Sequence, residues 1–91
     1  MSINVHFEEA ELLIVYISNF RRLSKETAKR FIKQMSLSTY PDIRDVQKKL
    51  RKSVYQWVYF DKPIDYNRLI ALASAVRNKA EVEAKNSVPK S

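Results

Sequence analysis

Apolar side chains recur at helical spacing in four segments of the chain. Residues that return every three or four positions lie on one face of an α-helix, whereas strand residues alternate. The pattern predicts helices over about residues 6–22, 25–37, 42–60 and 66–84. Short polar breaks separate the four segments. We therefore expect an all-α protein, a small antiparallel four-helix bundle formed by one domain over residues 1–85.

The first segment is ambiguous in its middle. One stripe at helical spacing contains Phe7, Ala10, Leu13, Ile14 and Ile17. Leu12, Val15 and Tyr16 lie outside this stripe, so the middle of residues 6–22 is apolar all round. Such a segment can be a central helix or a dimer surface. It can also be a strand, because Ile, Val and Tyr favour sheets. We predict a helix, and a homodimer through residues 6–22 stays open.

The second and third segments have clear boundaries and two-sided patterns. Ser24 is a typical N-cap residue, and Pro41 suits the first turn of the next helix. Along residues 42–60 a core stripe is formed by Ile43, Val46, Leu50, Val54 and Trp57. At about 100° per residue, a second set lies within about 80° on the opposite face: Arg44, Lys48, Lys52, Tyr55 and Tyr59.

The fourth segment begins after Asp65, which can cap it, and its apolar face runs from Tyr66 to Ala80. Residues 86–91 lack periodicity, so we expect them to form a short flexible tail.

Composition excludes most catalytic and metal-binding classes. The 91 residues contain no Gly, no Cys and one His. A phosphate-binding glycine loop, a disulfide framework, a zinc finger and a thiolate nucleophile all need residues that are missing. His6 lies near the N-terminus, where a structural role is expected. The carboxylates lie mostly at helix starts, where they interact favourably with the positive end of the helix dipole. We predict that the protein is not an enzyme and uses no cofactor or metal.

Positive charge is concentrated in one third of the chain. The net charge is +7, and residues 21–52 hold eleven Lys and Arg against three acids, or +8. Such a field attracts nucleic acid, an anionic lipid surface or an acidic protein, although a merely solvated basic face would look the same. We predict partner binding through the following residues: Lys29, Lys33, Arg44, Lys48, Lys52, Tyr55, Tyr59 and Lys62.

The location of the protein is predicted from two further observations. The longest apolar run, residues 12–17, is far shorter than the ~18 residues of a spanning helix, and acids precede it. The absence of Cys agrees with a reducing compartment. We expect a cytoplasmic protein that can associate with a membrane surface.

The stretch VQKKLRKSVYQWVYFDKPIDYNRLIALASAVRNK, residues 46–79, resembles a known family. It combines an apolar helix with an aromatic end (residues 55–60), a short polar break and a helix with a leucine-rich face (residues 69–74). In these features it is similar to the bacteriocin immunity proteins of lactic acid bacteria, in particular the group that resembles enterocin A immunity protein.

The resemblance implies an antiparallel four-helix bundle in the cytosol of the producing cell. It implies protection against a pore-forming peptide, through contact with the complex of that peptide and its membrane receptor. It also implies that specificity resides in the C-terminal half, here residues 61–65, the fourth helix and residues 86–91. The alternative from the residues alone is a small nucleic-acid-binding regulator that uses the cationic and tyrosine face of residues 25–59.

Overall fold

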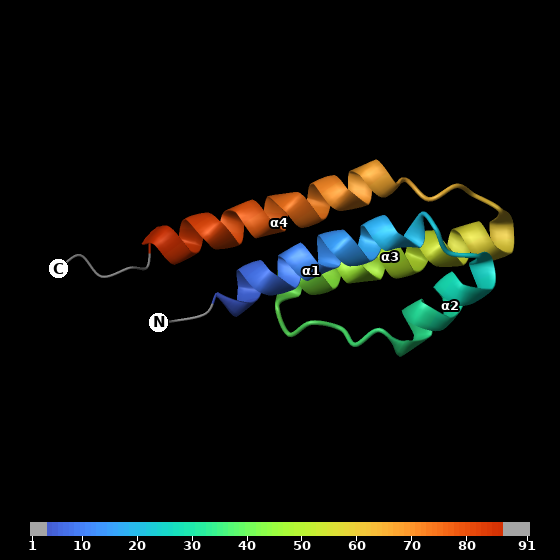
Figure 1. Cartoon of the computed structure of the whole chain (residues 1–91), viewed down its shortest axis with the longest axis horizontal. Helices are drawn as coiled ribbons and strands as arrows, with labels where there is room; N and C mark the ends of the chain where they lie inside the picture. The colour runs from blue at the N-terminus through green and yellow to red at the C-terminus, as the bar shows by residue number, and fades with distance from the viewer. Residues whose placement is uncertain (1–3, 87–91) are drawn as a thin grey trace.

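The computed structural model describes residues 4–86, which form four α-helices and no strand. The helices are α1 (Val5–Phe20), α2 (Lys25–Gln34), α3 (Pro41–Phe60) and α4 (Tyr66–Asn86) (Figure 1). The predicted all-α helical bundle is thus confirmed. Of the tail predicted over residues 86–91, Asn86 is the last residue of α4, and the others lie outside the described residues.

Two hydrogen bonds near the helix ends show the relative direction of α1 and α4. The Asn4 side chain donates to the Ala80 carbonyl (3.2 Å), and the Tyr66 hydroxyl donates to the Phe20 carbonyl (3.3 Å). The start of α1 therefore lies beside the end of α4, and its end beside the start of α4. Figure 1 shows α1 and α4 side by side, and it shows α2 beside the C-terminal half of α3. The molecule is elongated, 55 × 22 × 21 Å.

The core is built from one face of each helix. Its fully buried larger side chains are Ile17, Phe20, Ile43, Leu50 and Val54. Trp57 is half-buried and packs against this core, as the stripe along residues 42–60 predicts. In α1, Leu13 is 5% exposed and the adjacent Leu12 is 67% exposed. The first segment is therefore a helix with one face in the core and an apolar face in solvent, and the strand alternative is wrong.

The second helix is shorter than predicted. It begins after Ser24, whose hydroxyl accepts from the Thr27 amide as expected of an N-cap, but it ends at Gln34 rather than at residue 37. Met35 already has an extended backbone (ψ 124°). The Gln47 side chain accepts from the Ser38 amide (2.8 Å) and donates to the Ser36 carbonyl (3.2 Å). These bonds tie the backbone of Ser36 and Ser38 to α3, where a longer α2 would instead form helical hydrogen bonds.

The helix predicted over residues 6–22 also ends early, because residues 21–22 form a turn after Phe20.

The third and fourth helices start where the sequence indicates. Pro41 is in the first turn of α3 and Tyr40 is extended (ψ 120°). The Asp65 carboxylate accepts from the Arg68 amide (3.2 Å) and thereby caps α4.

The end of α3 requires a left-handed residue in a chain that has no glycine. Asp61 adopts φ 55° and ψ 31°, the left-handed helical region. Its backbone amide donates to the Trp57 carbonyl and that of Lys62 donates to the Gln56 carbonyl. These bonds satisfy carbonyls that the last turn would otherwise leave free. Asp is one of the few residues other than Gly that tolerates this conformation.

Candidate functional site

The outer face of α3 carries an exposed aromatic cluster near its C-terminal end. Because residues 41–60 form one uninterrupted helix, Tyr55 and Tyr59 lie one turn apart on the same side. Their ring centroids are 4.6 Å apart, and the Phe60 ring lies 6.2 Å from Tyr55. Tyr55 is 56% exposed and Tyr59 53% exposed. The prediction that these tyrosines face solvent while Trp57 packs inward is confirmed.

Helix α2 places two predicted lysines beside this cluster. Between α2 and α3 lies a groove of about 480 Å³, lined by Lys29, Ile32, Lys33, Arg51, Val54, Tyr55, Val58 and Tyr59. Ile32 and Val54 are buried and form its floor together with the half-buried Val58. The three cations lie at its rim and are exposed. We call this feature the α2–α3 groove.

Cation–aromatic contacts join α2 to the end of α3. The Lys29 ammonium lies 5.3 Å from the centre of the Tyr59 ring, and the Lys25 ammonium lies 5.8 Å from that of Trp57. The side-chain interaction with Tyr59 raises the pKa of Lys29, and Glu26 adds a smaller electrostatic effect in the same direction. Lys25 also forms a 2.7 Å ion pair with Asp61, which lowers the pKa of that carboxyl.

Two of the three cations at the rim of the α2–α3 groove have no ion-pair partner among the residues that the structure describes. Within the described part of the chain, no carboxylate lies within ion-pair distance of Lys33 or Arg51. Positive charge beside tyrosines and above an apolar floor can bind a ligand that is both anionic and partly apolar.

The structure divides the eight predicted binding residues. Lys29, Lys33, Tyr55 and Tyr59 line the α2–α3 groove. Lys52 lines a different depression of about 340 Å³ between α3 and α4, with residues such as Ser53 and Arg68. The other three line neither depression: Arg44, Lys48 and Lys62. The α2–α3 groove therefore brings together four of the eight residues, and the part that all eight play in binding stays a prediction.

Arg51 is the groove residue that the sequence did not single out. It lies just outside the set on the outer face of α3, on the side toward Val58 and Val54. Only the position of α2 shows that this side of α3 borders a groove. The spacing of Lys29 and Lys33 on α2 gave no indication of which side of α3 they would meet.

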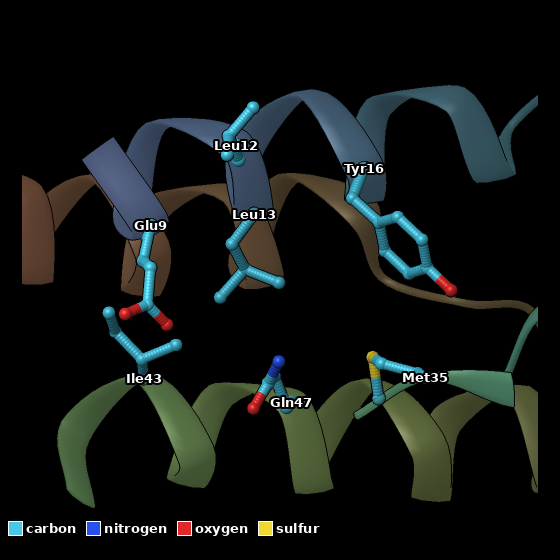
Figure 2. Close-up of a pocket in the computed structure, with 7 residues that line it drawn as sticks. All are labelled: Glu9, Leu12, Leu13, Tyr16, Met35, Ile43 and Gln47. Atoms are coloured by element: carbon cyan, nitrogen blue, oxygen red, sulfur yellow. The ribbon is translucent and has the colours of Figure 1, made fainter. Parts of the chain in front are cut away.

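A smaller hollow of about 190 Å³ lies under α1, and Figure 2 shows its lining. Leu13 points toward Ile43, whereas Leu12 points away from α3. Glu9 is already engaged there, because its carboxylate accepts from the Ser38 hydroxyl (2.8 Å). The size of the hollow and these internal bonds indicate a packing feature.

The only histidine has internal partners. His6 lies 3.0 Å from the Asp42 carboxylate and stacks on Tyr40, with 4.3 Å between ring centroids. These contacts join the start of α1 to the start of α3.

The described residues contain no group of three His, Cys, Asp or Glu that could hold a metal. Among them, no helix is both long and apolar enough to cross a membrane.

Comparison of the chain with protein-family models, with curated protein sequences and with solved structures found no match.

Proposed function

We propose that this protein is a non-catalytic binding protein of the bacteriocin immunity type, which contacts its protein partner through the α2–α3 groove. The observation that carries the proposal is the composition of that groove. Tyr55 and Tyr59 are exposed on one continuous helix, and Tyr together with Arg supplies the usual anchors of protein interfaces. The apolar floor would accept a partner side chain.

Two features support the immunity type in particular. The fold is the four-helix bundle that the resemblance of residues 46–79 implies. The C-terminal half of α3, which supplies Arg51, Tyr55 and Tyr59 to the groove, belongs to that stretch. A cationic rim would also suit an encounter at the negatively charged cytoplasmic leaflet, at about 1 kcal/mol per well-placed cation.

The test is survival of a sensitive bacterial strain that expresses the protein. Cells are challenged with a panel of pore-forming bacteriocins that use a membrane receptor, and survival against at least one peptide is expected. The variant Tyr55→Ala/Tyr59→Ala should lose this protection. Lys33→Glu should weaken it, whereas Arg30→Glu, which makes the same charge change at an exposed residue of α2 outside the groove lining, should not. Survival no better than that of the empty strain with every peptide contradicts the proposal.

The role of the C-terminal half is tested separately. The resemblance places specificity in residues 61–65, α4 and residues 86–91. Changing Lys62 and Asp65, or deleting residues 86–91, should therefore alter which peptide the cells survive. If these changes leave the range of protection unaltered, specificity does not reside there.

A nucleic-acid-binding regulator is the second candidate, and the arrangement of the groove favours it specifically. Two exposed tyrosine rings lie among three cations, the combination that stacks bases and contacts phosphates. If Lys29, Lys33 and Arg51 each contact one phosphate, log affinity for single strands should fall with log salt at a slope of about −2. A gel-shift series at several salt concentrations measures this slope. No shift of DNA or RNA at low salt eliminates this candidate.

A further inference from the structure

The outward face of α1 carries an uncovered row at coiled-coil spacing. Alternate steps of three and four residues place five side chains on one stripe of α1, and Arg22 follows at the same spacing in the turn after Phe20; the five are Val5, Glu8, Leu12, Val15 and Asn19. All six are exposed, and the central pair consists of Leu12 at 67% and Val15 at 56%. Figure 1 shows α1 in front of α3, and no other helix covers it in that view. This surface is separate from the α2–α3 groove.

The charges of this row are complementary to those of a second copy of the row that runs in the opposite direction. An acid, Glu8, lies near its start, and a base, Arg22, lies at its end. If a second α1 lies antiparallel across it, position 12 faces position 15, position 8 faces 19, and the turn that holds Arg22 lies beside the start of the other α1. The Arg22 side chain then lies one turn from Glu8 of the other copy, within reach of its long stem. Both ends of the pairing gain this contact, because a twofold axis repeats it.

We propose that α1 forms an antiparallel pair with α1 of a second copy of this chain, about a twofold axis between Leu12 and Val15. A shallow depression of about 330 Å³ beside the row, to which Tyr16, Asn19, Arg22 and Phe31 contribute, would add contact area. Self-complementary charge favours a second copy over an unrelated protein. A membrane surface fits poorly, since anionic lipid would repel Glu8 and Glu11.

One helix pair buries less than the ~1,200 Å² of a standard interface, so the association should be weak, with a dissociation constant in the micromolar range. Sedimentation equilibrium over a concentration series should show the mass rising from 10.7 kDa toward twice that value. The variant Leu12→Glu/Val15→Glu should remain monomeric at every concentration. Val82→Glu is the matched control, because it places a charge on an exposed apolar residue of α4 and should still dimerise. Circular dichroism verifies that each variant is helical.

Charge reversal tests the direction of the pairing. Glu8→Arg alone or Arg22→Glu alone should weaken the dimer roughly fivefold, because each creates a repulsive pair at both ends. The double variant Glu8→Arg/Arg22→Glu should restore the wild-type affinity. Parallel helices would not show this rescue.

Because the chain contains no cysteine, disulfide trapping can report the register without interference. In the antiparallel pair, Glu8→Cys should crosslink with Asn19→Cys when the two variants are mixed and oxidised. Neither variant should crosslink with itself, because the two copies of position 8 are about 16 Å apart along the axis. A monomeric wild-type protein at all concentrations, no crosslink in the mixture, or self-crosslinking of either variant would each overturn the proposal.

Discussion

The Lys29 ammonium on α2 lies 5.3 Å from the centre of the Tyr59 ring on α3, so one contact joins the two helices that border the groove. The contact lies at the surface, where its effect on the protonation of Lys29 is easier to detect than an effect on stability. It is therefore a suitable probe of the groove in solution.

Replacement of Tyr59 should lower the pKa of Lys29. The interaction with Tyr59 raises this pKa in the folded protein, so Tyr59→Leu should return it toward the ordinary value of a lysine. Since the raised pKa favours the protonated form, the contribution of Lys29 to stability is present at neutral pH and is lost as pH rises through the folded-state pKa. Carbon NMR of the lysine side chains follows the titration. Tyr55→Leu is the control and should leave the pKa of Lys29 unchanged.

The adjacent leucines of α1 should differ sharply in their effect on stability. Leu13 is buried in the core, so Leu13→Ala should reduce the free energy of unfolding by about 2–5 kcal/mol. Leu12 faces solvent, and Leu12→Ala should change it by less than about 0.5 kcal/mol. Urea unfolding measures both, at a protein concentration low enough to keep the chain monomeric. Equal losses would mean that the orientation of α1 is wrong.

Removal of the Ser38 hydroxyl should destabilise the segment between α2 and α3. Ser38 is buried; its hydroxyl donates to Glu9 (2.8 Å) and accepts from the Tyr40 amide (3.1 Å). Ser38→Ala leaves both partners without this bond, which should cost about 1–3 kcal/mol of unfolding free energy. Ser36→Ala changes an exposed serine of the same segment and is the control. If the two variants unfold at the same urea concentration, the buried network contributes nothing.

The conformation of Asp61 can be tested without regard to its ion pair. Asp61→Gly and Asp61→Ala both remove the contact with Lys25, so the difference between them reports the backbone alone. Because the left-handed region disfavours a Cβ, the Gly variant should melt at the higher temperature. Thermal unfolding followed by circular dichroism measures the two midpoints. An Ala variant that is as stable as the Gly variant would show that residue 61 does not need a positive φ.

Local sequence predicted the helices because each carries its own signals. Ser24 caps α2, Pro41 begins α3 and Asp65 caps α4, and each acts on residues within one turn. The end of α2 was predicted three residues too late, since Gln47, distant in sequence, determines the path of residues 36–38. A periodic pattern contains no information about such a partner.

The candidate site, too, was predicted in part by local sequence and in part determined only by the tertiary structure. Amino-acid order by itself determined that Tyr55 and Tyr59 share the outer face of α3, because a regular helix fixes the angle between residues four apart. Only tertiary structure decided that Lys29, Lys33 and Arg51 gather around them while Arg44, Lys48 and Lys62 do not. Which cations surround the tyrosines depends on the side of α3 against which α2 packs. The packing of both helices against the shared core determines that side.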